Sequence, residues 1–137
     1  LDLAAEGKTL NREQLEQMYA LKTGALIHAS IVSACLLSAA IDDTRAAALD
    51  RFARAIGIAF QIKDDILDVE GETDVIGKAA GADERQQKST YPALFGLDES
   101  RRRCNELLLG ALDELEPFGD RGIPLAWLAR FIVERGQ

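Results

Sequence analysis

The ten residues Phe60–Val69 constrain the fold of this chain more than any other stretch. Helical periodicity leads into them, and residues three or four apart lie on the same face of a helix. Asp64 therefore lies one turn from Asp68, and Asp65 also neighbours Asp68. Apolar side chains occupy the other faces, so the stretch predicts a long helix that carries a narrow acidic stripe.

Such a stripe is unfavourable by itself. Like charges at this spacing cost about 0.2–0.5 kcal/mol per pair. We also expect the helix to end near Val69, just before Gly71, where anions oppose the helix dipole. A divalent cation such as Mg²⁺ would reverse the repulsion, because it prefers clustered carboxylate oxygens. The triplet alone also fits a solvated helix face, but Gln61 in line and the nearby lysines favour a metal site.

The rest of the chain predicts further helices and no strand, so the fold class is all-α, with residues 1–137 as a single helical domain. In the last helix, packing against the others is expected for Leu125, Leu128, Ile132 and the pair Trp127/Phe131. We predict a first helix that starts at an Asn11 cap, a long helix from Asp42 or Asp43 to about Val69, and a short helix that starts at Pro92. A fourth helix begins at an Asp98 cap and covers about 99–116, and a last helix follows Pro124.

The segment Thr23–Ile41 has no formal charge and approaches the length of a membrane span. Serines, a histidine and the lack of flanking aromatic residues favour a buried core helix instead. That helix is too apolar for burial on one side only, so it should expose an apolar face that another part of the protein covers. Gly24 indicates a kink or close packing, and Gly57 would admit a close neighbour. Lys22 follows Tyr19 on the apolar stripe of its helix, and its side chain lies either at the rim of that stripe or facing a polar cavity.

Net charge and the rare residue types exclude several classes of function. The charge of −7 argues against nucleic acid or an anionic membrane surface as a partner, and an anionic substrate would need metal ions and placed lysines. Cys35 and Cys104 are far apart, which indicates buried thiols of a cytosolic protein and neither zinc nor disulfides. His28 is the only histidine and is interpreted as structural.

The segment Glu70–Ser89 lacks periodicity and contains three glycines among mixed charges. A loop of that length in a compact domain is usually functional or disordered. Because it follows the acidic helix, we interpret it as a flap that can bring Lys78 and Lys88 over the aspartates.

Four motifs stand in order along the chain, and they are Lys22-Thr23-Gly24, Phe60–Asp68, Gly77-Lys78 and Lys88–Pro92. They resemble motifs of the trans-isoprenyl diphosphate synthases, in which Phe60–Asp68 corresponds to the second aspartate-rich motif. The likeness is closest to the bacterial farnesyl diphosphate synthases (geranyltranstransferases). Asp2 with Glu6-Gly7 resembles the helix that precedes these motifs, so the resemblance covers essentially the whole chain.

The resemblance implies a bundle of long helices around a deep cavity, with two aspartate-rich motifs facing each other across its mouth. It implies that Asp64 binds Mg²⁺ directly, while Asp65 and Asp68 assist. Arg135 stands where some members place a basic tail near the substrate. It also implies that a diphosphate is bound by Lys22, Lys78 and Lys88. Thr23 and Gln61 are implied to line the cavity near the reacting carbons. The implied catalytic residues are Lys22, Thr23, Gln61 and Lys78.

The implied reaction is prenyl transfer from an allylic diphosphate, dimethylallyl or geranyl, to isopentenyl diphosphate. The implied product is a short-chain prenyl diphosphate, most closely farnesyl diphosphate. Mg²⁺ is the implied cofactor, and the implied intact enzyme is a cytoplasmic homodimer that binds neither nucleic acid nor membrane.

The chain departs from the family pattern in one large respect. It contains a single Asp-Asp-x-x-Asp, and neither the first aspartate-rich motif nor the isopentenyl diphosphate site has a counterpart. We therefore expect these residues, which start at Leu1 without a methionine, to be the C-terminal half of the enzyme and inactive alone. A non-catalytic helical partner that retains the fold for assembly, or a terpene cyclase, are the alternatives.

Overall fold

The computed structural model describes residues 10–38, 40–75 and 89–136, and all of the regular structure in these ranges is helical, as predicted. The N-terminal helices form one continuous run that includes a π-helical turn, η1, and a short 3₁₀ helix, η2, precedes the last helix. The elements are α1 (Arg12–Tyr19), η1 (Ala20–Gly24), α2 (Ala25–Leu37), α3 (Asp43–Val75), α5 (Tyr91–Phe95), α6 (Leu97–Asp113), η2 (Glu116–Gly122) and α7 (Ile123–Glu134).

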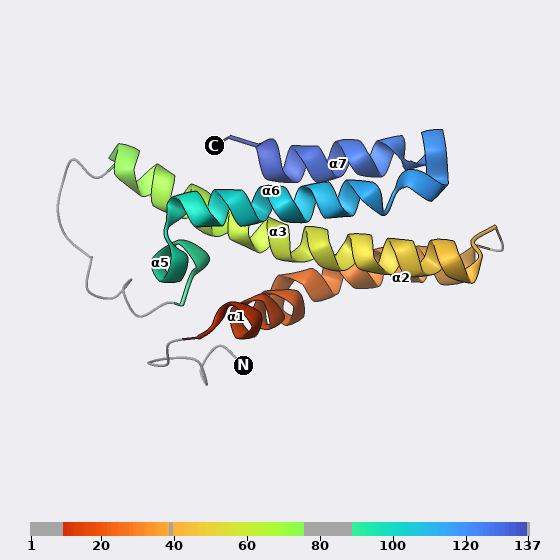
Figure 1. Cartoon of the computed structure of the whole chain (residues 1–137), viewed down its shortest axis with the longest axis horizontal. Helices are drawn as coiled ribbons and strands as arrows, with labels where there is room; N and C mark the ends of the chain where they lie inside the picture. The colour runs from red at the N-terminus through yellow and green to blue at the C-terminus, as the bar shows by residue number, and fades with distance from the viewer. Residues whose placement is uncertain (1–9, 39, 76–88, 137) are drawn as a thin grey trace.

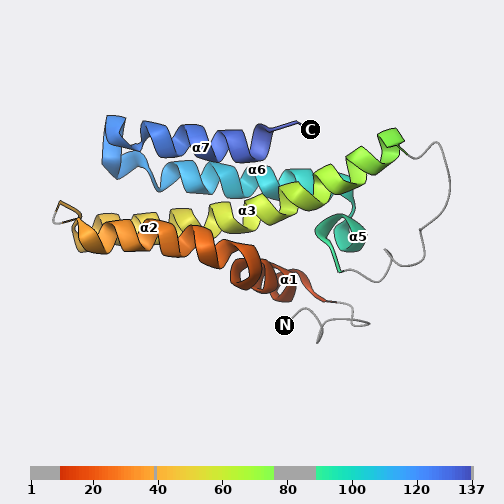
Figure 2. The same ribbon diagram turned by 180° about the vertical axis from the view of Figure 1, so that it is seen from behind.

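The long helix α3 is the centre of the structure. Figure 1 shows α1 and α2 along one side of α3, and α6 with α7 along the other. The reverse view in Figure 2 shows the same order, with α5 near the start of α1 and the start of α6. The core lies along α3, and its buried members include Leu15, Tyr19, Phe52, Ile56, Ile62, Ile66, Tyr91, Cys104, Leu108 and Ala111.

The first helix begins at the predicted cap. The Asn11 side chain accepts from the backbone N–H of Gln14 at 2.9 Å, and the backbone N–H of Asn11 donates to the Gln14 side chain at 3.1 Å. This reciprocal pair satisfies two donors that the first turn leaves open.

Two glycines let η1 and α3 approach closely, as the sequence indicated. A Cβ atom added to Gly57 would lie 2.7 Å from the Cα of Gly24, which is far inside van der Waals contact. A Cβ on Gly24 would lie 3.5 Å from the Cα of Gly57, which is an ordinary contact. Only Gly57 therefore requires the absence of a side chain.

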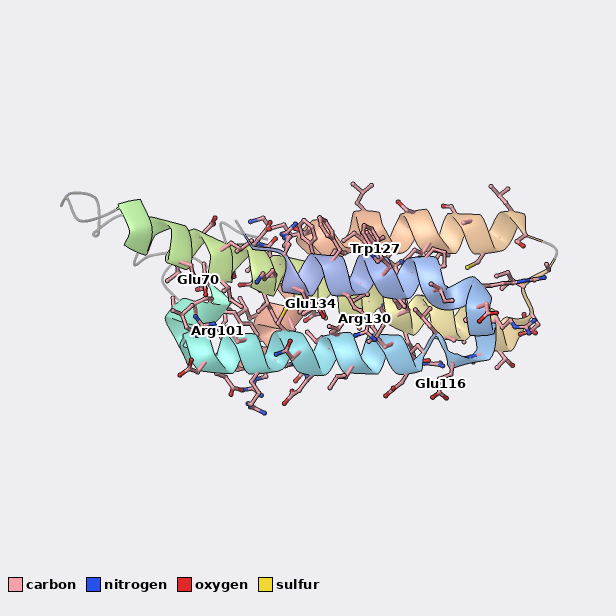
Figure 3. All side chains as sticks on the ribbon, turned by 90° about the horizontal axis from the view of Figure 1, so that it is seen from above. Glu70, Arg101, Glu116, Trp127, Arg130 and Glu134 are labelled. Carbon is pink, nitrogen blue, oxygen red and sulfur yellow. The ribbon has the colours of Figure 1, made fainter. Side chains whose placement is uncertain are left out.

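Two of the predicted helix boundaries are wrong. The helix with the acidic stripe continues past Val69 and through Gly71 to Val75. Its end is held by Arg101 of α6, which binds Glu70 at 2.7 Å, and Figure 3 labels both residues at this end of the bundle. Asp98 does not cap α6, because Gly96 is the N-cap, with a φ of 84° that favours glycine.

The helix α2 is not a buried core helix, which corrects the first expectation for Thr23–Ile41. None of its residues is buried, and Leu26, Leu36 and Leu37 are 76%, 83% and 89% exposed. This agrees with the second expectation, that the segment is too apolar for burial on one side. Within the described residues, Arg12–Leu37 is long and apolar enough to cross a membrane by length and composition alone, which is weak evidence because core helices pass the same test.

The last helix also leaves apolar side chains in the open. Trp127 and Phe131 are 65% and 53% exposed, so the expectation that they pack against the other helices is wrong. Their rings stack on each other with centroids 5.5 Å apart. Figure 3 shows Trp127, Arg130 and Glu134 along α7. The buried side of this helix consists of Ile132, as expected, together with Ala129 and Val133.

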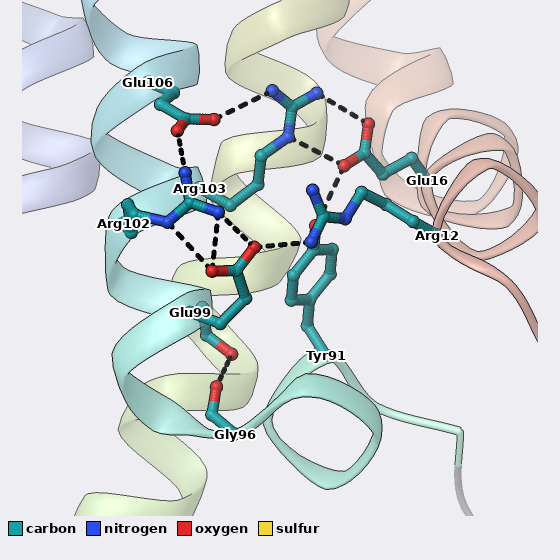
Figure 4. A network of polar contacts seen from close by, with 9 residues as sticks. Arg12, Glu16, Tyr91, Gly96, Glu99, Arg102, Arg103 and Glu106 are labelled. Carbon is teal, nitrogen blue, oxygen red and sulfur yellow. Dashed lines mark hydrogen bonds and ion pairs between the residues drawn. The ribbon is translucent and has the colours of Figure 1, made fainter.

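An ionic network joins α1, α5 and α6 (Figure 4). The guanidinium of Arg103 donates to both oxygens of Glu16, at 2.8 and 2.9 Å. The hydroxyl of Tyr91 donates to the same carboxylate at 3.1 Å. Burial, together with the Glu16 charge, raises the pKa of Tyr91 to about 12. This network fixes α1 and α5 against the start of α6.

The remaining rare residue types are one histidine and two cysteines. His28 of α2 lies 2.5 Å from the carboxylate of Asp50 on α3, in keeping with its structural interpretation. Two hydrogen bonds, the stronger effect from Arg54 and the weaker from His28, lower the pKa of Asp50 to about 2. Both cysteines are free thiols, but only Cys104 is buried, and Cys35 is half-buried.

Candidate active site

The acidic stripe lies in the interior of α3, not at its end. Asp64 and Asp68 lie four residues apart in a helix that continues to Val75. The helix dipole therefore does not oppose these carboxylates, contrary to the prediction, because its effect is confined to the last turn. Like-charge repulsion along the helix remains as the unfavourable contribution.

The three aspartates lie in different environments. Asp68 is exposed. The side chain of Asp64 is 42% exposed and forms an ion pair with Arg135, which directly follows α7. Asp65 is buried, with 7% exposure. The stripe thus divides into two carboxylates that solvent reaches and one that it does not.

Arg135 connects the end of the chain to this stripe. Its guanidinium donates to Oδ1 of Asp64 and lies over the ring of Phe60, 4.6 Å from the centroid. The contact is a cation–π interaction, which strengthens as the site loses water. The side chain of Arg135 is 22% exposed, so the negative charge of Asp64 is neutralised by a partly buried partner.

Asp65 accepts hydrogen bonds from three donors. Its Oδ2 accepts from the hydroxyl of Tyr19 and, at 3.2 Å, from the backbone N–H of Tyr91. Its Oδ1 accepts from Nε2 of Gln61 at 3.1 Å. Burial raises the pKa of Asp65, although each of the three donors acts to lower it. Burial and the Asp65 charge also raise the pKa of Tyr19.

Thr23 and Gln61, both predicted to line the cavity, are in contact. The hydroxyl of Thr23 donates to Oε1 of Gln61 at 2.7 Å. Their meeting follows from the glycine contact, because Thr23 directly precedes Gly24 and Gln61 lies one turn after Gly57. The exposed Lys22 lies in the same π-helical turn.

Lys78 and Lys88 lie outside the described residues, as does most of the proposed flap. Their roles toward a diphosphate therefore stay predictions. The described part of Glu70–Ser89 begins as helix, since residues up to Val75 belong to α3.

The carboxylates of the stripe fit a magnesium ion that shares its coordination with water and phosphate. Within the ranges that the structure describes, no group of three His, Cys, Asp or Glu side chains is close enough to enclose a metal. Mg²⁺ does not require such a cage, because it usually binds one or two carboxylates and completes its shell with waters and substrate phosphates. Asp64 and Asp68 provide two hard oxygen donors one helical turn apart.

Two tyrosines of the site were not predicted from the sequence. Tyr19 was interpreted only as part of an apolar stripe, and Tyr91 only as part of a motif. One signal was available for Tyr19, which lies one turn before Thr23 on the same helix. The contact of Tyr91 with Asp65 spans 26 residues, and no local pattern predicts it.

A family model, polyprenyl synthetase, matches residues 1–116 of the chain. The chain belongs to the polyprenyl synthetase family. The all-α fold agrees with solved structures of similar proteins.

Two relatives show how far the likeness extends. The farnesyl diphosphate synthase of Escherichia coli is 40% identical over 140 residues, which covers 100% of this chain and 47% of that protein. The geranylgeranyl diphosphate synthase of Cyanophora paradoxa is 40% identical over 138 residues, covering 100% of this chain and 46% of that protein. This polyprenyl synthetase chain thus spans about half the length of the curated relatives it matches.

A solved structure supports the same relationship. A Helicobacter pylori geranyltransferase, complexed with magnesium and isoprenyl diphosphate, superposes with a TM-score of 0.67 and 28% identity. The superposition covers 97% of this polyprenyl synthetase chain and 42% of the other chain.

Proposed function

We propose that these residues form the C-terminal part of a magnesium-dependent prenyltransferase that condenses an allylic diphosphate with isopentenyl diphosphate. The observation that carries the proposal is the α3 face, where solvent-accessible Asp64 and Asp68 lie beside the Thr23–Gln61 pair. Membership of the polyprenyl synthetase family supports it. The magnesium and isoprenyl diphosphate bound by the similar Helicobacter pylori structure support the choice of ligands.

In this proposal Asp64 holds Mg²⁺ directly and Asp68 assists. The metal, when bound, neutralises the charge that grows on the leaving diphosphate. Lys22 adds positive charge to the same group, and Lys78 and Lys88 keep their predicted roles there. Thr23 and Gln61 line the region where the carbon atoms react. Arg135 is paired with Asp64, so a metal ion that binds Asp64 has to displace Arg135 or share the carboxylate with it.

The proposed reaction breaks one C–O bond and forms one C–C bond. The C–O bond of the allylic diphosphate breaks, and the diphosphate leaves with the bonding electrons. The double bond of isopentenyl diphosphate attacks the allylic cation, a C–C bond forms, and a proton is lost. Positive groups that are already in place lower the barrier to the first step, because they need no reorganisation as charge develops.

We infer farnesyl diphosphate as the product, although both farnesyl and geranylgeranyl diphosphate synthases are among the relatives. We further propose a cytoplasmic homodimer. The exposed leucines of α2 and the exposed ring pair of α7 support burial against further residues of the intact protein or against a second copy.

The full-length protein that carries these residues should incorporate labelled isopentenyl diphosphate into a product one isopentenyl unit longer than the added geranyl diphosphate. Removal of Mg²⁺ should abolish incorporation, and residues 1–137 alone should form no product. Chromatography of the labelled product measures both its formation and its length. A folded full-length protein without incorporation would favour the assembly partner. Consumption of geranyl diphosphate without isopentenyl diphosphate would favour a cyclase.

A further inference from the structure

Asp65 uses both of its oxygen atoms as hydrogen-bond acceptors inside the protein. Its Oδ2 is bound by the Tyr19 hydroxyl and the Tyr91 amide, and its Oδ1 by the Gln61 amide. The residue is 7% exposed. Solvent hardly reaches these oxygen atoms, and a metal ion that displaced one of the three donors would leave that donor without a partner at a large cost.

The charge of Asp65 determines which way the Gln61 side chain points. A carboxylate can only accept hydrogen bonds, so it selects the NH₂ end of the Gln61 amide, at 3.1 Å. The carbonyl end must then face the opposite way. There it accepts the hydroxyl hydrogen of Thr23 at 2.7 Å.

The same chain of bonds determines the polarity of Thr23. A hydroxyl has one hydrogen to donate and two lone pairs. Since Thr23 donates its hydrogen to Gln61, only the lone pairs remain for other groups. Thr23 therefore acts as an acceptor toward its surroundings, although it is two hydrogen bonds away from the Asp65 charge.

Stability alone does not explain a carboxylate at this position. Burial disfavours the ionised form, as the raised pKa of Asp65 indicates. Well-packed apolar groups often replace buried charges without loss of stability. A role in orienting other side chains accounts for a charge that is costly to bury.

We propose that Asp65 is a positioning residue and not a metal ligand, and that its buried charge fixes Gln61 and Thr23 in the orientation that catalysis requires. This inference rests on the proposed prenyltransferase function. It predicts that an exchange of the carboxylate and the amide between positions 61 and 65 preserves the orientation of Thr23, whereas the loss of the carboxylate reverses it.

The test compares Asp65→Asn, Gln61→Glu and the double variant in the full-length protein. Asp65→Asn keeps the shape and the acceptor for Tyr91, but its new NH₂ group turns the Gln61 amide over and frees the Thr23 hydroxyl. We expect kcat to fall about 10²-fold, the scale of one lost oriented contact. Adding Gln61→Glu provides a carboxylate that accepts from both neighbours, and should recover at least about tenfold of that loss.

Two readouts separate this role from metal binding and from a merely structural role. The affinity for Mg²⁺ with inorganic diphosphate, measured by calorimetry, should change less than about threefold in Asp65→Asn, and thermal melting should show a folded protein. A tenfold weaker affinity would make Asp65 a ligand and overturn the proposal. A double variant no more active than Asp65→Asn would overturn it as well.

A further variant covers the case in which Asp65→Asn does not fold. Gln61→Glu alone places two carboxyl groups in contact, so they share one proton. Its activity relative to the unmodified protein should rise as the pH is lowered, and an unchanged pH profile would contradict the proposal.

The side-chain amide signal of Gln61, assigned in NMR spectra by its loss in Gln61→Glu, reports the orientation without any catalysis. Exchange with water should be slow in the unmodified protein and faster in Asp65→Asn. Equal exchange rates would overturn the positioning role. Absence of product from the unmodified protein would instead refute the prenyltransferase function.

Discussion

Replacing Asp64 by alanine in the full-length protein should lower kcat about 10²–10⁴-fold, the scale for removal of a charge-stabilising group. The KM for the allylic diphosphate should rise much less. Neutralisation of the leaving diphosphate matters most in the transition state, so its loss affects kcat before it affects substrate binding. Steady-state kinetics at saturating Mg²⁺ measures both parameters.

Three further variants control this experiment. Asp64→Asn can still accept a hydrogen bond from Arg135, so it separates the loss of charge from the loss of that contact. Lys22→Ala should worsen both kcat and KM, because a diphosphate-binding lysine acts in the ground state too. Lys63→Ala should be close to neutral, because its charge lies near Cys104 of α6 and off the acidic stripe. A loss in Lys63→Ala equal to that in Asp64→Ala would refute the assignment of the helix faces.

Replacing Gly57 by alanine should destabilise the protein by about 2 kcal/mol. The added Cβ would meet the backbone of Gly24 at 2.7 Å, where neither helix can yield without moving. Overpacking of this kind costs up to about 3 kcal/mol, and the better helix propensity of alanine returns roughly 1 kcal/mol. Since the same contact places Thr23 beside Gln61, kcat should fall as well. Equilibrium denaturation with urea measures the change in stability.

Matched glycine variants test the geometric reason. Gly110→Ala in α6 meets nothing within 4 Å and should stabilise the protein by about 0.5–1 kcal/mol. Gly24→Ala makes only ordinary contacts and should be tolerated. If all three alanine variants had the same stability, the close approach of η1 and α3 would be wrong.

Several features of this fold could be predicted from residue type and spacing within a short stretch of sequence. The Asn11 cap, the helical periodicity and the close approach at Gly24 and Gly57 could all be inferred, because each depends on residue type and spacing. The end of α3 could not, because the ion pair between Glu70 and Arg101 supports the helix past Gly71 from another element.

The site shows the same division. Spacing placed Asp64 and Asp68 on one face of a helix, but it could not distinguish them from the buried Asp65. That difference is produced by Tyr19, 46 residues away, and by Tyr91. The ion pair of Asp64 with Arg135 spans 71 residues. Burial and pairing over such separations are properties of the packed bundle, and periodicity carries no information about them.

Calorimetric titration of inorganic diphosphate into the full-length protein tests most directly whether the α3 face is a metal–diphosphate site. We expect that diphosphate binding requires Mg²⁺ and that its affinity is unchanged in Lys63→Ala. In Asp64→Asn the affinity should be at least about tenfold weaker, which is the scale of one lost charged contact. Binding of equal affinity without Mg²⁺, or in Asp64→Asn, would contradict the assignment of this face as the active site.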